Sequence, residues 1–172
     1  MRYFYRRFSD ESLNKLYELL EDVTPQRYDC GLLCGAACCR GDRKDGMLLF
    51  PGEKEAFAGK DGYTVRFNSA YGCDEVVCSG SCRREERPLS CRIYPYFFYV
   101  REDGSVTVAP DVRALEGCPL AEKGTGASRL FLRRMRMAAL VLERDPAQTT
   151  FLRQVGAALT DLGTLDDLLS SK

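Results

Sequence analysis

The sequence predicts an α+β protein with a small, irregular, cysteine-rich core and one short hairpin, packed against helices at both ends of the chain. The chain has 172 residues, so we expect a single domain over residues 1–172. Residues 26–120 hold all nine cysteines and the expected strands. Residues 1–25 and 128–172 contain no cysteine and show the apolar spacing of helices. A hydrophobic content of 45% and a charged content of 29% exclude a wholly disordered chain.

The first expected helix covers residues 9–23. Apolar side chains recur there every three or four positions from Leu13 to Val23, which places them on one helix face. Ser9 or Asp10 can accept hydrogen bonds from the free amides of the first turn. A proline two residues after Val23 ends the helix.

Short strands are expected at residues 47–50 and 63–68, where apolar and β-branched residues are bounded by turn residues. Ile93–Val100 and Ser105–Val108 flank an Arg-Glu-Asp-Gly sequence, which is typical of a hairpin turn. The other stretches of this part of the chain show no sustained period and are expected to be loops: 30–46, 72–92 and 109–127.

Two helices are expected near the end of the chain. Residues 128–143 place apolar side chains on one face. An Asp-Pro-Ala-Gln sequence from residue 145 resembles a capping box with proline at the first helical position. The helix that it begins should run to Leu162 and end at Gly163, and Thr164 can cap a short last turn.

The charge balance and the absence of histidine exclude several function classes. The chain has 25 basic and 25 acidic residues, so it creates no basic field and a nucleic-acid partner is not expected. It has no histidine, which excludes Ser-His-Asp catalysis, Cys-His catalysis and zinc sites that need imidazole. No catalytic base or nucleophile other than the thiols is evident, so the sequence leaves open whether the protein is an enzyme.

The compartment decides how nine thiols are interpreted. The first residues contain no apolar leader, and the longest apolar run is interrupted by Pro95 and is too short for a bilayer. We therefore expect a cytoplasmic protein without a membrane partner. Disulfides rarely persist in a reducing cytosol, where a cysteine-rich sequence is more often metal-binding. The odd number of cysteines would also leave one thiol over in a disulfide framework.

The first cysteine constellation consists of Cys30, Cys34, Cys38 and Cys39. Spacings of four would put the first three on one side of a helix. A tight loop whose amides face the sulfurs is equally compatible, because glycines follow two of the cysteines. The adjacent pair is poorly placed for a mutual disulfide. It could serve two metal ions or two edges of one cluster.

The second constellation is Cys73, Cys78, Cys82 and Cys91, with Cys118 further along in a Gly-Cys-Pro sequence. Tetrahedral zinc takes four ligands, so eight thiolates would fill two zinc sites. An iron–sulfur cluster needs about four cysteines. Both the number of centres and the pairing of ligands therefore stay open.

Arginines accompany the cysteines. Zn²⁺ with four thiolates is a dianion, and burying it requires compensating charge or hydrogen bonds. Arg87 and Arg92 bracket Cys91 and are expected to donate hydrogen bonds to sulfur. The alternative is a solvated basic loop that contacts an acidic partner.

Two other features have structural alternatives. The aromatic run Tyr94–Tyr99 could stack on bases, but we expect alternate rings to form core and the others to shield the metal from water. Asp42, Asp45 and Glu53 are candidate oxygen ligands, and a polar turn explains them equally well.

The stretch Cys82–Pro95 resembles part of a known signature. It reads Cys-Arg-Arg-Glu-Glu-Arg-Pro-Leu-Ser-Cys-Arg-Ile-Tyr-Pro, similar to the second half of the signature of the YkgJ-like cysteine-cluster family, described as zinc- or iron-chelating. Cys34–Cys39 is similar to the end of the first half, with one extra residue. Cys30 also departs from the family spacing by one residue, and Cys78 resembles the cysteine that precedes the Arg-Pro segment.

The resemblance covers about residues 30–95 and implies metal chelation rather than a reaction. Flagellin lysine methylases carry a similar domain in a longer chain. This chain lacks their extra length and a glycine-rich nucleotide loop. It also lacks the cysteine spacing of radical S-adenosylmethionine enzymes, because Ala37 stands at the critical position.

These observations define the expected site. Cys118 is preferred to Cys73 as a ligand, because Gly-Cys-Pro resembles the Cys-Pro that often closes a cluster site. The expected cofactor is zinc or iron, including a 4Fe-4S cluster, and Arg87 and Arg92 support it. The eight expected metal ligands are Cys30, Cys34, Cys38, Cys39, Cys78, Cys82, Cys91 and Cys118.

Three function classes follow from this site. A metal-binding protein, our first expectation, should have closed four-ligand sites. An iron–sulfur redox protein or cluster-dependent enzyme, such as a methylase-like accessory protein, should show an open coordination position beside a pocket. A zinc-stabilised module with a protein partner should show an exposed apolar patch away from the metal.

Overall fold

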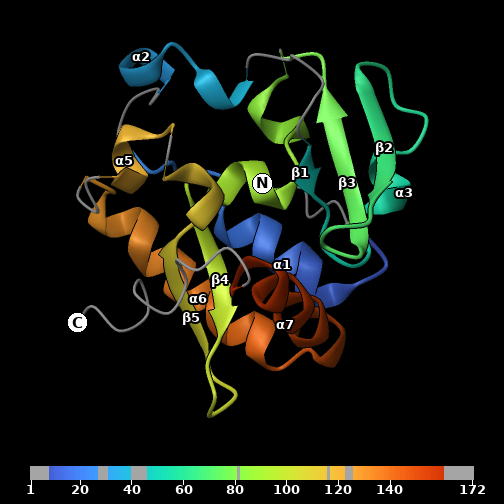
Figure 1. The fold of residues 1–172 in the computed structure, drawn as a ribbon, viewed down its shortest axis with the longest axis vertical. Coiled ribbons are helices and arrows are strands. Elements are labelled where there is room, and N and C mark those ends of the chain that lie inside the picture. Colours follow the sequence, from blue (N-terminus) through green and yellow to red (C-terminus); the bar gives the residue numbers. More distant parts are fainter. Residues whose placement is uncertain are drawn as a thin grey trace, which may run out of the picture.

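The computed structural model describes residues 8–26, 31–39, 46–80, 82–115, 117–122 and 126–160. Its helices and two small antiparallel sheets confirm the α+β class (Figure 1). The three-stranded sheet lies at one side of the molecule, and the hairpin lies in the middle, with the longer helices packed around it (Figure 1). No helix in the described stretches is long and apolar enough to cross a bilayer.

The three-stranded sheet contains β1 (Met47–Leu48), β2 (Tyr63–Asn68) and β3 (Cys73–Cys78), in the order β1-β3-β2. The strands expected at residues 47–50 and 63–68 are therefore confirmed, although the first is shorter.

The expectation of a loop over residues 72–92 is wrong, because this stretch contains the central strand β3. Two cysteines and two acidic residues hid its β-character. Val76 and Val77 are buried, and the buried carboxylate of Glu75 accepts hydrogen bonds from Arg66 and Asn68 on β2. Cross-strand polar pairs thus stabilise a strand that composition alone does not indicate.

Short helical turns occupy the rest of the cysteine-rich part. The expected loops over residues 30–46 and 109–127 both contain such turns. In chain order they are α2 (Gly31–Cys34), η1 (Ala37–Cys39), α3 (Lys54–Phe57), η2 (Arg84–Glu86), α4 (Leu89–Ile93), η3 (Val112–Ala114) and α5 (Pro119–Glu122).

The expected hairpin is confirmed as β4 (Tyr96–Val100) and β5 (Val106–Pro110), paired with Val100 opposite Val106. Its turn is closed by the amide of Arg101, which donates to the carbonyl of Ser105 at 2.9 Å. The aromatic side chains of β4 are all buried. The interpretation of the run as core is confirmed for β4, but the expected alternation is wrong, because all four rings of this strand are buried and none is open for base stacking.

The long helices begin where their capping residues predict. Asp10 accepts from the amides of Ser12 and Leu13 at the start of α1 (Glu11–Leu19), and Ser128 caps α6 (Arg129–Glu143). Helix α1 ends earlier than expected, although Leu20 and Val23 beyond it are still buried. Helix α7 is described over Pro146–Thr160. Its predicted end, at Gly163 and Thr164, lies outside the described residues.

Gln148 does not act as the second half of a capping box. Its side chain is buried, and its Nε2 donates to the carboxylate of Asp10 at 3.2 Å and to the carbonyl of Pro51 at 3.1 Å. The residue that resembled a local cap therefore joins the first turn of α7 to the first turn of α1.

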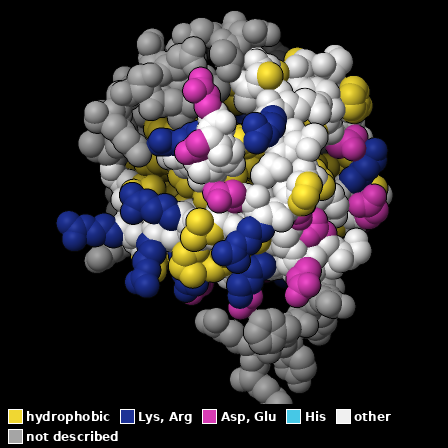
Figure 2. Space-filling model, turned by 90° about the horizontal axis from the view of Figure 1, so that it is seen from below, with side chains coloured by type: hydrophobic (Ala, Val, Ile, Leu, Met, Phe, Trp, Pro, Cys, Tyr) yellow, Lys and Arg dark blue, Asp and Glu magenta, His cyan; other side chains and the backbone are white. Residues whose placement is uncertain are grey.

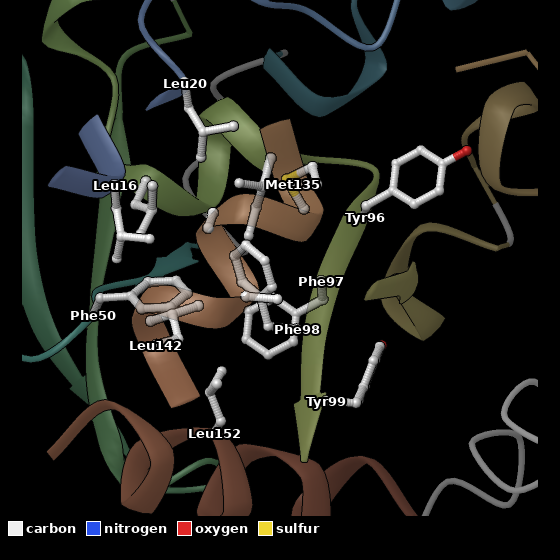
Figure 3. Packing of buried hydrophobic residues seen from close by; sticks show 14 of the residues in the cluster. Leu16, Leu20, Phe50, Tyr96, Phe97, Phe98, Tyr99, Met135, Leu142 and Leu152 are labelled. Atoms are coloured by element: carbon white, nitrogen blue, oxygen red, sulfur yellow. The ribbon is translucent and has the colours of Figure 1, made fainter. Parts of the chain in front are cut away.

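The main core lies between β4 and the three long helices. Figure 3 shows Leu16 from α1, Met135 and Leu142 from α6 and Leu152 from α7 around the rings that β4 contributes. Phe50 lies among them, with its ring centroid 4.9 Å from that of Phe151 and 6.0 Å from that of Phe97. Burying each such ring contributes about 1.5–3 kcal/mol, so this cluster is the main apolar support of the fold.

Glu53 connects this core to the cysteine-bearing part. The side chain is fully buried, and its carboxylate accepts hydrogen bonds from the hydroxyl of Tyr17 and from the amides of Phe50 (2.7 Å) and Leu89 (2.8 Å). Both oxygens are therefore used to join α1, the segment after β1 and the first turn of α4. Glu53 has a structural role in place of the metal-ligand role considered above.

We expect Glu53→Gln to lower the free energy of unfolding by about 2–4 kcal/mol, because the amide nitrogen would face buried donors. Glu55→Gln is the matched control, since Glu55 is exposed in α3, two residues after Glu53, and its replacement should change stability by less than about 0.5 kcal/mol. Urea denaturation of both variants measures the difference. Equal midpoints for the two variants would contradict the role assigned to Glu53.

Candidate metal centre

The first cysteine constellation is split by a reversal of the chain. Cys34 ends α2, whereas Cys38 and Cys39 lie in the separate turn η1. Between them Gly35 and Ala36 adopt left-handed φ values of 61° and 54°. Glycine tolerates this conformation, and alanine does so at a cost of about 1–2 kcal/mol. The helix that would carry three cysteines on one face is therefore not formed.

Cys38 and Cys39 have close sulfurs that are not bonded to each other. Their Sγ atoms lie 3.8 Å apart, well beyond the length of a disulfide bond. In a tetrahedral zinc site with Zn–S bonds of about 2.3 Å, two ligand sulfurs are separated by about 3.8 Å. All cysteines in the described stretches are free thiols.

Cys34, Cys38 and Cys118 line one small cavity, and we call them the pocket thiols. The cavity wall also includes the side chain of Tyr94 and the ring of Pro95. The amide of Cys118 donates to the carbonyl of Ala114 at 2.9 Å, which fixes Cys118 just before α5. The structure thus brings Cys118, which lies far along the chain, next to Cys34 and Cys38 of the first constellation. Cys30, the remaining predicted ligand of that constellation, lies outside the described residues.

A second group of sulfurs forms around the 82–91 loop, and we call its members the arginine-side thiols: Cys39, Cys78, Cys82 and Cys91. They come from η1, the end of β3, the loop before η2 and α4. Burial, together with the charges of the nearby sulfurs of Cys39, Cys82 and Cys78, raises the pKa of Cys91 well above its ordinary value. The mutual influence of these sulfurs shows that distant segments bring them into one electrostatic environment.

Arg87 faces the same sulfurs. Its burial opposes ionisation, but a hydrogen bond to Cys82 and the nearby sulfurs of Cys82, Cys39 and Cys91 outweigh burial and raise the pKa of the guanidinium. Its Nε is buried and has no hydrogen-bond partner among the described residues. The guanidinium therefore stays charged and keeps one buried donor that is not used by the described residues.

Arg92 has a different position from Arg87. Its Nε donates to the carbonyl of Arg87 and its Nη2 to the carbonyl of Glu85, both at 3.0 Å. The guanidinium also lies over the ring of Tyr17, 4.6 Å from its centroid. These contacts hold the loop that carries Cys82 in place, which supports the site through the backbone.

Sequence reasoning did not select two residues that also shape this loop. The guanidinium of Arg84 donates to the carbonyls of Leu20, Glu21 and Val23 after α1. Tyr63 stands opposite Cys78 in the β2–β3 register, and burial together with the nearby Cys82 raises its pKa. The alternating pattern of residues 63–68 predicts the strand that positions Tyr63. No local pattern predicts which backbone carbonyls accept hydrogen bonds from Arg84.

Cys73 lies apart from both groups. It stands five residues from Cys78 at the other end of β3, about 17 Å away at the usual rise of a strand. Its side chain packs against the main core, and burial raises the pKa of its thiol to about 11. That Cys73 is the thiol left over stays a prediction.

In the described part of the chain, no three Cys, Asp or Glu side chains already stand close enough to hold a metal ion. The donor set nevertheless suits one, since thiolates are the preferred ligands of zinc and of iron–sulfur clusters. The unused donor of Arg87 also suits an anionic sulfur. Comparison with protein-family models, curated proteins and solved structures finds no match to this chain. The geometry of the thiols therefore carries the functional argument.

Cys73 should react slowly with iodoacetamide, because only the thiolate attacks. With a pKa of about 11, its thiolate fraction at pH 8 is about 100-fold below that of a thiol of pKa 9. Because the thiolate fraction increases with pH below the pKa, the rate of alkylation of Cys73 should rise about tenfold per pH unit up to pH 10. Mass spectrometry that locates the label on Cys73 measures this rate, and a plateau near pH 9 would contradict the assignment.

Proposed function

We propose that this protein is a cytoplasmic metal-binding protein that holds zinc or iron–sulfur centres through cysteine alone. The observation that carries the proposal is that Cys39, Cys82 and Cys91 lie near the guanidinium of Arg87, and that Cys78 joins the thiols around Cys91. The pocket thiols form a second set, and we include Cys30 in it on the basis of its spacing. The YkgJ-like resemblance of Cys82–Pro95 agrees with this proposal.

Charge supports a metal as the reason for this convergence. Several thiols close together are costly to ionise, and a divalent ion removes that cost by bonding the thiolates directly. Four thiolates around Zn²⁺ leave two negative charges, of which Arg87 neutralises one. A thiolate would also accept from the buried Nε, and leaving such a donor unsatisfied costs about 1–3 kcal/mol.

The donor set limits what the bound metal can do. Four cysteines leave no open position on zinc, so the arginine-side thiols suit a structural or stored ion. An iron–sulfur cluster bound by these thiols in place of zinc would add electron transfer, because the cluster itself carries the redox chemistry. Because every donor in this group is sulfur, we propose metal holding before catalysis.

Serine substitutions test this proposal. Cys91→Ser should lose about one metal equivalent per chain, because oxygen replaces one of four sulfurs in a buried site. Cys73→Ser, at the end of β3 away from both thiol groups, is the control and should retain the full metal content. Elemental analysis of anaerobically purified protein measures both, and its absorption spectrum separates colourless zinc from a coloured cluster. Full metal content in Cys91→Ser, or its loss in Cys73→Ser, would refute the ligand assignment.

A second candidate function, binding of a protein partner, is favoured by the outer face of α6. Leu130, Met137 and Leu140 on that face are 55%, 43% and 57% exposed. They alternate with arginines, and among the described residues Arg133 and Arg136 have no ion pair. On the side of the molecule where α6 and α7 lie, several basic side chains and a few acidic ones border a hydrophobic patch (Figure 2). This apolar and basic face of α6 fits an acidic amphipathic helix. Such a helix would place leucines against Leu130, Met137 and Leu140 and carboxylates against the arginines.

A synthetic peptide with leucines three and four residues apart and flanking glutamates is the probe for that partner. We expect it to bind the wild type, and Leu140→Asp to weaken binding at least tenfold through repulsion and lost apolar contact. Ala157→Asp, at an exposed position of α7, is the control and should bind normally. Fluorescence anisotropy measures the affinities, and equal binding of a scrambled peptide would contradict a specific site.

A further inference from the structure

We propose that the free edge of β2 pairs with the same strand of a second copy of this chain and forms a weak dimer with twofold symmetry. The two antiparallel β2 strands join two three-stranded sheets into one continuous sheet. The inference concerns the backbone and the surface side chains of this sheet. It does not depend on the thiols or on a bound metal.

The outer side of β2 is an open edge. The strand is at the end of the sheet order and at the margin of the molecule, and no segment in the described stretches pairs with its outer side (Figure 1). The carbonyl of Gly62 accepts a hydrogen bond from the amide of Ser79 at 3.1 Å. In the one-to-one register of β2 with β3, every second residue after Gly62 therefore directs its amide and carbonyl toward β3. The residues between them direct these groups outward, and they are Tyr63, Val65 and Phe67.

The opposite edge of the same sheet is closed. Strand β1 has only two residues, and the carbonyl of Leu48 accepts a hydrogen bond from the hydroxyl of Ser90. Proteins block exposed edges with very short strands, prolines or bulges. Strand β2 has six residues, contains no proline and pairs with β3 without a bulge. Its edge is therefore a template for another strand.

The backbone and the charges select one register for a second copy. A twofold axis at Val65 places outward groups opposite outward groups, so the two Val65 residues exchange both of their hydrogen bonds. The amide of Phe67 then donates to the carbonyl of Tyr63 in the second copy. An axis at Arg66 also matches outward groups, but it places two arginines directly opposite each other, which destabilises a strand pair. The axis at Val65 places each Arg66 opposite Thr64 instead.

The side chains of one face fit the same register. Tyr63, Val65 and Phe67 alternate onto the face that carries Phe57, whose ring centroid lies 5.3 Å from that of Tyr63. Phe67 stands at the end of this row and is 66% exposed. In the dimer it lies opposite Tyr63 of the second copy, and cross-strand aromatic pairs stabilise a sheet. Each Phe67 therefore gains a partner that its own chain does not provide among the described residues.

The size of the interface sets its strength. Stable protein interfaces bury about 1,200–2,000 Å², and one pair of six-residue strands lies at or below the low end of this range. The dimer should therefore be reversible and form only at high protein concentration. Assembly stops at two chains, because the twofold pair uses both β2 edges and the edge of β1 is closed.

Sedimentation velocity of the full chain over a range of concentrations tests the inference. The wild type should shift from monomer to dimer as the concentration rises, without larger species. Phe67→Lys should weaken the dimer about tenfold or more, because it places an ammonium group beside Lys60, whose Nζ lies 5.0 Å from the ring centroid of Tyr63, and it acts twice in a twofold dimer. Leu32→Lys, which also replaces an exposed apolar side chain, is the matched control and should dimerise like the wild type.

Hydrogen exchange identifies the interface. The amides of Val65 and Phe67 should be protected in concentrated protein and exchange rapidly in dilute protein. Val65→Pro removes the central donor without breaking a bond to β3 and should leave the chain monomeric. If that variant does not fold, Phe67→Lys decides, because Phe67 is exposed.

Three results would overturn the inference: a wild type that is monomeric at every concentration, a dimer that Phe67→Lys does not weaken, or a dimer in which the amides of Val65 and Phe67 stay unprotected. Each of them leaves the proposed metal binding intact. Elemental analysis of the same samples measures metal content separately.

Discussion

The hydrogen bonds of the Glu53 carboxylate fix the distance between the apolar core and the cysteine-bearing loops. A buried carboxylate is stable only when its oxygens are satisfied, and here the donors come from Tyr17, Phe50 and Leu89. Leu89 opens the helical turn that carries Cys91 and Arg92. The position of this turn, and with it the position of Cys91, therefore depends on Glu53. Because Glu53 also contacts α1, the packing of α1 and the placement of the sulfur depend on each other.

The two thiol groups share a boundary but differ in surroundings. Adjacent residues of η1 contribute to both, with Cys38 facing the pocket and Cys39 facing Arg87. The reversal at Gly35 and Ala36 makes this division possible, because a continuous helix would have turned the sulfurs by fixed steps about its axis. A strained turn at this point is consistent with a functional constraint on the backbone.

The sequence predicts the local elements of this fold well. The hairpin and the starts of α1, α6 and α7 follow from nearby residues such as Asp10, Ser128 and a turn glycine. Strand β3 was missed because its burial depends on neighbouring strands, and Gln148 was misassigned because its partners are about 100 or more residues away. Long-range polar contacts of this kind have no local signature.

The candidate site was predictable in composition but not in grouping. Spacing identified the thiols, and it favoured Cys118 over Cys73 by analogy alone. Which sulfurs approach one another depends on the length of β3, which carries Cys73 and Cys78 to opposite ends, and on the turn that parts Cys38 from Cys39. Neither feature is visible before the fold is known.

X-ray absorption at the metal edge of anaerobically purified protein tests the central claim most directly, because it reports which atoms bind the ion. All-cysteine centres predict a first shell of sulfur only, about four per metal, at about 2.3 Å. A shell dominated by nitrogen or oxygen, or a purified chain whose sulfurs are joined as disulfides with no metal bound, would contradict it.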